Sequence, residues 1–249
     1  MQEKSEKTTG SLSTKEARLI DTANKELNIA QESFFIEKDF NFDMDNTKVV
    51  NNKKILEIKD LSFSYDKQNK IISDFNLLIT GPERLAIYGD NGTGKTTLLK
   101  LITQELSADS GSILFGTNKI NYLDQNISLL NDELSIIDNY LSINDNVSEQ
   151  DARNNLARFL FRNKLASKLV KDLSGGEKLR AGLAITLTSK TPPELLILDE
   201  PTNHLDINSI NFLERVLNDY KGALLVISHD QVFLQHIKIN KKIILGEDD

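Results

Sequence analysis

The segment GDNGTGKTT at residues 89–97 constrains the fold of this 249-residue chain more than any other. It follows the apolar run RLAIY and opens the helix-forming stretch KTTLLKLITQEL, and this strand–loop–helix context is what the phosphate-loop pattern requires. Glycines let backbone N–H groups turn inward around phosphates, and the N-terminus of the following helix favours negative charge. The segment therefore predicts an α/β core with a phosphate-binding loop.

Within this loop we expect Lys95 to reach the β and γ phosphates of a nucleotide and the Thr96 hydroxyl to ligate Mg²⁺. The other loop residues that we expect to bind the nucleotide are Gly89, Asn91, Gly92, Thr93, Gly94 and Thr97. A chance glycine-rich turn is the alternative, and the flanking strand and helix argue against it.

The run LLILDE at residues 195–200 ends a predicted buried strand with two carboxylates. Two adjacent acids are costly to bury without a function. We expect Asp199 to hold Mg²⁺ and Glu200 to polarise an attacking water as general base. A strand that ends in a solvated acidic turn is the alternative interpretation.

The segment LSGGE at residues 173–177 places two glycines at the start of the predicted helix EKLRAGLAITL. Ser174, Gly175 and Gly176 would then form a second anion-binding helix terminus. Taken alone, the segment is also compatible with an ordinary N-cap.

Composition excludes several other classes of site. The chain has no cysteine and 3 histidines, so disulfides, thiolate metal sites and a histidine-rich metal site are disfavoured. The polar N-terminus lacks the apolar core of a secretory signal, and no run reaches the roughly 18 apolar residues of a membrane span. A reducing cytoplasm is compatible with this composition.

The charge distribution neither predicts nor excludes binding to nucleic acid. The formal net charge of -7 argues against general affinity for a polyanion. Residues 153–180 nevertheless carry many more Lys and Arg than acids. Both a solvated helix face and a local RNA-facing patch would explain this excess.

We predict two segments. Residues 1–54 are expected to be an interdomain linker with one amphipathic helix at about 13–38, since Ser13 and Glu16 have capping-box spacing. Its apolar seam comprises Ile20, Ala23, Leu27, Ala30 and Phe34. Whether this seam meets a partner helix or the helix's own domain stays open.

Residues 55–249 are expected to form a mixed α/β domain with a small helical subdomain at about 127–175. The runs at 55–65, 70–80, 111–116 and 119–124 are predicted as mostly antiparallel strands, and those at 84–89, 195–199 and 223–228 as the buried parallel core.

The phosphate loop, LSGGE, LLILDE and the tripeptide SHD, in this order, resemble the nucleotide-binding domain of the ABC ATPase superfamily over roughly residues 55–245. The resemblance implies a P-loop ATPase fold with a mixed core sheet and an antiparallel β subdomain. It also implies ATP and Mg²⁺ as cofactors. ATP would be sandwiched between the phosphate loop of one domain and the LSGGE segment of another, so Ser174, Gly175 and Gly176 would complete a partner's site.

The same resemblance implies roles for four further residues. Tyr65 would stack on adenine, and Gln125 would sense the γ phosphate and Mg²⁺. His229 would hydrogen-bond the γ phosphate. Asp206 would lie at the interface with the second domain. No catalytic role is assigned to His204 or His236.

The segment PTNHLD at residues 201–206 resembles the ABC-F proteins, which are tandem ATPases that act on the ribosome. On this resemblance the chain would be a second ATPase domain with part of the preceding linker, starting within a longer protein. It would be a weak ATPase when isolated. Its partners would be a second nucleotide-binding domain or a homodimer mate, the ribosome and tRNA, with antibiotic resistance as one biological role.

The sequence is also compatible with two other functions. An ATPase subunit of an ABC transporter, with the membrane domain on a separate chain, is the main alternative. A module that binds nucleotide only structurally is disfavoured, because the chain has all of the expected catalytic and metal-binding residues, Lys95, Asp199, Glu200 and His229.

Overall fold

A computed structural model describes residues 42, 44–66, 69–90 and 92–246 of the chain. The chain divides into two compact units, Met1–Asn41 and Phe42–Asp249, and all described residues belong to the second. The predicted helix at about 13–38 and the loop residue Asn91 lie outside the described residues.

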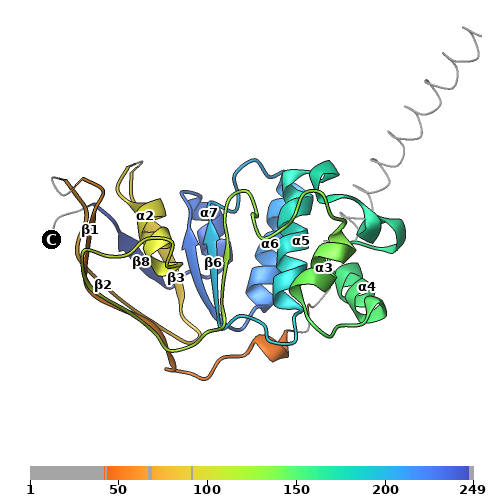
Figure 1. The fold of residues 1–249 in the computed structure, drawn as a ribbon, viewed down its shortest axis with the longest axis horizontal. Helices are drawn as coiled ribbons and strands as arrows, with labels where there is room; N and C mark the ends of the chain where they lie inside the picture. Colours follow the sequence, from red (N-terminus) through yellow and green to blue (C-terminus); the bar gives the residue numbers. More distant parts are fainter. Residues whose placement is uncertain (1–41, 43, 67–68, 91, 247–249) are drawn as a thin grey trace, which may run out of the picture. The chain divides into compact units, whose positions relative to one another are not determined.

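An antiparallel sheet of three strands forms one end of this unit (Figure 1). Strand β1 (Lys54–Ser64) pairs antiparallel with β2 (Lys70–Thr80) on one side and with β4 (Ser110–Phe115) on the other. The sequence predictions for these three strands are confirmed. Their alternating apolar residues supply the inner face, as expected of a sheet with one wet side.

The core sheet has five parallel strands in the order β5-β6-β7-β3-β8. These strands are β3 (Arg84–Tyr88), β5 (Ile120–Leu123), β6 (Leu195–Asp199), β7 (Ala223–Ile227) and β8 (Lys241–Ile244). Because the strands are parallel, the loops that follow them emerge at one edge of the sheet, where α/β proteins place their ligand sites.

Two details of this sheet differ from the sequence prediction. The run at 119–124 was grouped with the antiparallel strands, but β5 pairs parallel with β6, with Tyr122 opposite Ile197. Its short connection to β4 misled the prediction, because the chain leaves one sheet and enters the other there. Strand β8 was not predicted, because this edge strand is largely exposed and its lysines hide the apolar pattern.

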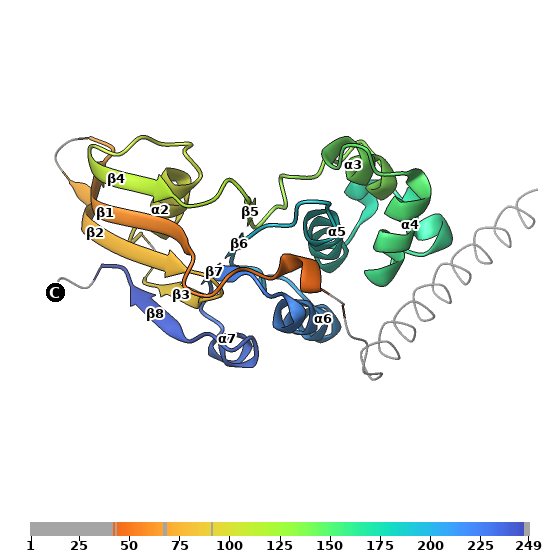
Figure 2. The ribbon, with the colours of Figure 1, turned by 90° about the horizontal axis from the view of Figure 1, so that it is seen from below.

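The two faces of the core sheet carry different layers. Alternate residues such as Leu85 and Ile197 face a cluster that contains α2 (Lys95–Ile102) and the antiparallel sheet. Their neighbours, such as Ala86 and Leu196, face a second cluster that contains α5 (Gly175–Leu187). Helices α2 and α5 therefore lie on opposite faces of the sheet, and both ribbon views show them apart (Figures 1 and 2).

The remaining helices are α3 (Ile136–Ile143), α4 (Glu149–Arg158), α6 (Ile207–Asp219) and α7 (Gln231–His236), with 3-10 turns at Asp45–Thr47, Asn163–Ser167 and Val170–Asp172. Helices α3, α4 and α6 pack against α5, and α7 packs against α6. Helices α3 and α4 begin at the N-caps Ser135 and Ser148, whose hydroxyls accept backbone N–H bonds. Within the described ranges, no helix is long and apolar enough to cross a membrane.

The described residues before β1 belong to the second compact unit. The sequence had assigned residues up to 54 to a linker. Phe42 is 2% exposed, with its ring 5.1 Å from that of Phe159 and 5.4 Å from that of Phe212. Its backbone N–H donates to Asp219 Oδ2 at 2.8 Å. The polar composition of residues 41–54 concealed these anchors, so the compact unit begins earlier than residue 55.

Phe42→Ala should lower the free energy of unfolding by about 3 kcal/mol, because it leaves a cavity between two buried rings. Chemical denaturation measures this change. The matched control is Val50→Ala, since Val50 is 73% exposed and its loss should cost less than about 0.5 kcal/mol. Equal stabilities of the two variants would show that Phe42 is not part of the folded unit.

Candidate functional site

The loop between β3 and α2 has the backbone of a phosphate cradle. Gly89, Gly92 and Gly94 have φ angles of 151°, 90° and 95°, in the region that favours glycine. A Cβ at Gly94 would lie 2.8 Å from Ile71 Cγ2, so only glycine fits at the N-cap of α2. A Cβ at Gly92 would meet nothing within 4 Å, so the backbone there is open to a ligand.

Lys95 holds this loop together. Its ammonium donates to the carbonyl oxygen of Gly89 and, at 2.9 Å, to that of Asp90. The Thr93 hydroxyl donates to the same Asp90 carbonyl at 3.0 Å. The cation therefore lies at the centre of the loop, where an incoming phosphate would exchange these carbonyl contacts for stronger, charge-assisted ones.

The two threonines after Lys95 have different surroundings. Thr96 is exposed in the first turn of α2 and leaves its hydroxyl accessible. Thr97 is 6% exposed, and its Oγ1 lies 3.2 Å from the Tyr65 hydroxyl. Thr97 therefore connects the loop to the predicted adenine-stacking residue.

Tyr65 presents an exposed ring beside α2. It is 62% exposed, and its ring meets that of Phe63 edge-on with centroids 4.9 Å apart. Together with the Thr97 contact this fixes the ring while leaving a face accessible. A rigid, accessible aromatic face next to a phosphate loop suits stacking on a nucleotide base.

Two carboxylates stand at the end of β6. Asp199 is the last residue of the strand, and burial raises the pKa of its carboxyl, although the Tyr122 hydroxyl donates to Oδ2 at 3.3 Å. Glu200 has a φ of 46°, and its N–H donates to the Ile227 carbonyl at 2.8 Å. Burial also raises the pKa of Glu200 against the opposing effect of His229.

His229 reaches this carboxylate pair from the adjacent strand. Residue Asp199 pairs with Ile227 in the parallel register of β6 and β7, which brings the two strand ends together. His229 Nε2 lies 3.4 Å from Glu200 Oε1. The imidazole and the carboxylate are therefore within reach of each other at this edge of the sheet.

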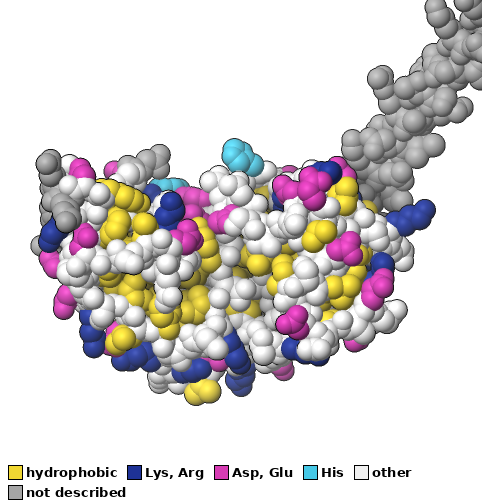
Figure 3. All heavy atoms as spheres, in the orientation of Figure 1, with side chains coloured by type: hydrophobic (Ala, Val, Ile, Leu, Met, Phe, Trp, Pro, Cys, Tyr) yellow, Lys and Arg dark blue, Asp and Glu magenta, His cyan; other side chains and the backbone are white. Residues whose placement is uncertain are grey.

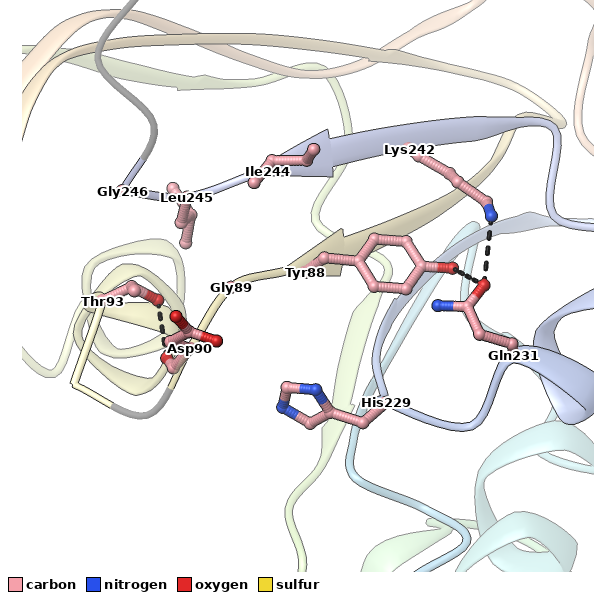
Figure 4. Close-up of a pocket in the computed structure, with 10 residues that line it drawn as sticks. All are labelled: Tyr88, Gly89, Asp90, Thr93, His229, Gln231, Lys242, Ile244, Leu245 and Gly246. Atoms are coloured by element: carbon pink, nitrogen blue, oxygen red, sulfur yellow. Dashed lines mark hydrogen bonds between the residues drawn. The ribbon is translucent and has the colours of Figure 1, made fainter.

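Two cavities open at this edge of the sheet. The larger, about 480 Å³, is lined by the phosphate loop, His229 and the end of β8 (Figure 4). Figure 4 shows the His229 ring and the Asp90 carboxylate on the same side of the strand that carries Tyr88. The phosphate loop and His229 thus share one open space.

The second cavity, about 250 Å³, joins Gln125 to Glu200 and Gly175. Gln125 is exposed at a turn held by Asp124, whose Oδ1 accepts the N–H bonds of Asn126 at 2.7 Å and Ser128 at 3.2 Å. His204, which the sequence assigned no role, also lines this cavity, with a φ of 61°.

The LSGGE segment begins α5 with a complete capping box. The Ser174 hydroxyl accepts the Glu177 N–H at 3.2 Å, and a Glu177 carboxylate oxygen accepts the Ser174 N–H at 2.8 Å. Ser174 and Gly175 are exposed. A Cβ on Gly176 would lie 2.2 Å from Ser209 Oγ, so that glycine lets α5 approach α6.

Asp206 is the N-cap of α6, with Oδ1 accepting the Ser209 N–H at 2.8 Å. Its predicted place at an interface with a second domain stays a prediction.

The structure thus brings the phosphate loop, Asp199, Glu200 and His229 to one edge of the sheet. Ser174 and Gly175 begin a helix on the other face of the sheet from α2.

At least half of the eight basic residues at 153–180 form ion pairs with acids of the same region. Their pairs are Arg153–Glu149 at 2.7 Å, Lys168–Glu177 at 3.2 Å, Lys171–Glu133 at 2.7 Å and Lys178–Asp132 at 2.7 Å. Arg180 is 6% exposed, with its guanidinium 5.6 Å from the rings of Phe161 and Phe212. Cations and acids are accordingly interspersed over the helical part in Figure 3. These contacts favour a solvated, ion-paired face over an RNA-facing patch.

A family model described as "ABC transporter" matches residues 72–203, which include the phosphate loop and LLILDE. The chain belongs to the ABC ATPase family. Similar curated proteins include ABC-F members. "ATP-binding protein Uup" of Buchnera aphidicola (subsp. Acyrthosiphon pisum) is 40% identical over 207 residues, covering 81% of this chain and 34% of that protein.

"ABC transporter F family member 5" of Arabidopsis thaliana is 33% identical over 223 residues, covering 87% of this chain and 32% of that protein. The chain thus spans about a third of the length of these relatives. A solved structure titled "Structure of ATP binding subunit of ABC transporter" has a TM-score of 0.66 at 24% identity, covering 77% of this chain and 85% of that one. That likeness shows the fold.

The two LSGGE glycines should respond differently to a methyl group. Gly176→Ala should lower the free energy of unfolding by about 1–3 kcal/mol, because the added Cβ collides with Ser209. Gly175→Ala should change it by less than about 0.5 kcal/mol, because its Cβ meets open space. Urea denaturation of both variants measures the difference, and equal losses would contradict the packing described for Gly176.

Asp199→Asn should raise the melting temperature at about pH 7 and lose this advantage at about pH 3. The pKa of Asp199 is raised from 3.8 by burial, so the folded protein disfavours its charged form. Wild-type stability from this group is complete below the unfolded pKa and is lost as pH rises through the folded pKa. Thermal melts of both proteins across this range, without nucleotide, test the sign. A variant that is less stable at neutral pH would contradict it.

Proposed function

We propose that this chain is an ATP-binding and ATP-hydrolysing domain of a ribosome-associated ABC-F translation factor. One observation carries the proposal. The phosphate loop and the Glu200–His229 pair meet at one sheet edge, while LSGGE begins a helix on the opposite face from α2. The likeness to ABC-F relatives and the segment PTNHLD support the branch.

The residues present fit ATP with Mg²⁺. The open backbone at Gly92 and the Lys95 ammonium suit polyphosphate, and the Tyr65 ring suits a base. The Thr96 hydroxyl and the Asp199 carboxylate are oxygen ligands of the kind Mg²⁺ prefers, leaving the remaining positions to phosphates and water. When bound, Mg²⁺ would neutralise charge on the β and γ phosphates. Gln125 would approach the same site from the smaller cavity.

Glu200 is the residue that we assign to proton abstraction. Its burial raises the pKa of the carboxylate, which makes the group a better proton acceptor at neutral pH. His229, 3.4 Å away, orients Oε1 and supplies a donor toward the terminal phosphate. Lys95 would move its contacts from the loop carbonyls to the phosphates.

A second nucleotide-binding domain would complete each site. Ser174 and Gly175 are exposed at the N-terminus of α5, where Gly175 lines the cavity that also contains Gln125 and Glu200. In the two-domain arrangement of the family they would face a nucleotide held by a partner. That partner is either a second domain of the same polypeptide or another copy of this chain. Hydrolysis by one isolated copy is then weak. The site of action is the cytoplasm, where the complete protein would meet the ribosome and tRNA.

Glu200→Gln should lower the rate of ATP hydrolysis by about 100-fold while preserving ATP binding, because the amide cannot accept a proton. In the full-length protein this variant should co-sediment with ribosomes when ATP is present. Lys95→Ala in the same background is the control and should abolish the ATP-dependent enrichment.

Absence of ATP-dependent enrichment of Glu200→Gln would contradict a ribosomal role. An ATPase activity that rises only with a membrane protein partner would instead identify a transporter subunit. Hydrolysis unaffected by Glu200→Gln would remove the assigned general base.

A further inference from the structure

Tyr122 carries an interaction that the proposed mechanism does not use. It lies on β5, one residue before the end of that strand. The chain then continues through Asp124 to Gln125. The Tyr122 hydroxyl donates to Asp199 Oδ2 at 3.3 Å across to the neighbouring strand β6. The side chain thereby connects the strand that precedes Gln125 to the carboxylate expected to hold Mg²⁺.

The register of the two strands explains why this contact forms. Tyr122 pairs with Ile197 in the parallel ladder of β5 and β6. Side chains two residues apart on a strand point to the same face, so Asp199 projects on the same side as Ile197. Tyr122 therefore reaches a carboxylate two residues beyond its register partner on the neighbouring strand, at the edge where the site lies.

The phenol can act only as a donor in this contact. A phenol keeps its proton at neutral pH, whereas an ionised carboxylate has only acceptor oxygens, so the Tyr122 hydroxyl donates to Asp199 Oδ2. One Asp199 oxygen thus carries a hydrogen bond and the other is left for a cation or its water. Metal-ligating carboxylates are commonly held by such a partner, whose loss costs about 10–100-fold in metal affinity or activity.

We propose that Tyr122 is a positioning residue for the Mg²⁺ site, orienting Asp199 through its hydroxyl. This inference rests on the proposed function, since it concerns the cation of the same ATP site. The remainder of the side chain has a separate structural role, because the ring lines a cavity of about 360 Å³ between the end of α2 and β4. Tyr122→Phe keeps that ring and removes only the hydroxyl.

The test measures binding of a fluorescent, non-hydrolysable ATP analogue to the intact chain as free Mg²⁺ is varied. For Tyr122→Phe, the Mg²⁺ concentration that gives half-maximal enhancement of binding should rise about tenfold. Binding of the analogue in EDTA should equal that of the wild type, because the phosphate loop is unchanged. A parallel ATPase assay should show the same shift in Mg²⁺ requirement.

The matched control is Tyr140→Phe. Tyr140 is a fully buried tyrosine whose hydroxyl contacts Thr188 in the helical region, so its loss tests for a general effect of removing a buried hydrogen bond. It should leave the Mg²⁺ requirement unchanged. In an Asp199→Asn background, adding Tyr122→Phe should produce no further tenfold shift, since the pair acts as one unit.

The possible results distinguish failure of the Tyr122 inference from failure of the proposed function. A wild type that responds to Mg²⁺ and a Tyr122→Phe variant with the same requirement would overturn the inference and leave the proposed function standing. An equal shift in Tyr140→Phe would overturn it as well, by showing a general structural effect. A wild type whose analogue binding ignores Mg²⁺ would overturn both the inference and the proposed cation site.

Discussion

Parallel pairing of β6, β7 and β3 is the interaction on which the rest of the site depends. In this register Ile227 of β7 pairs with Asp199 of β6 on one side and with Ile87 of β3 on the other. The three strands therefore end at the same level. The phosphate loop, the carboxylate pair and His229 each begin where one of these strands stops. None of these segments could hold its position alone, because short loops obtain their geometry from the strands that support them.

The edge of the sheet is also where the protein tolerates unfavourable local structure. Glu200 takes a positive φ, and burial raises the pKa of both carboxylates at the end of β6. Such strain and desolvation persist only where the surrounding fold enforces them. The apolar layers on both faces of the core sheet supply that enforcement. These features indicate that the protein gives up some stability to hold the site in a prepared geometry.

Much of this site was accessible from the sequence, because its residues occupy short motifs with local geometry. GDNGTGKTT lies between a strand and a helix that the sequence predicts, and LSGGE was predicted to begin a helix, either as an anion-binding terminus or as an ordinary N-cap. The capping box between Ser174 and Glu177 is seen only in the structure. Long-range contacts were not accessible. The hydroxyl of Tyr122 reaches Asp199 only because β5 joins the parallel sheet, and the sequence placed that run with the antiparallel strands. An aromatic residue with a polar tip, near the end of a strand that leads to Gln125, was the available signal.

The anchors before β1 were missed for another reason. Phe42 lies two residues from Phe40 and Met44, and this short alternation is followed by a stretch rich in Asn, Asp and Lys that is typical of a linker. The burial of Phe42 depends on Phe159 and Phe212, which are far away in the chain. Pattern analysis detects the faces of helices and strands, whereas anchors outside regular structure become visible only when their pocket is known.

The central claim is that the phosphate loop and the LSGGE segment of one chain serve two different nucleotides. It is tested most directly by mixing Lys95→Ala and Gly175→Arg copies of this chain, at a concentration where the unsubstituted chain hydrolyses ATP. The first variant lacks a working phosphate loop, and the second lacks a working LSGGE segment. Shared sites predict that each variant is inactive alone and that the mixture recovers activity, because an intact loop of one copy meets an intact LSGGE of the other. A mixture as inactive as its components would contradict the claim.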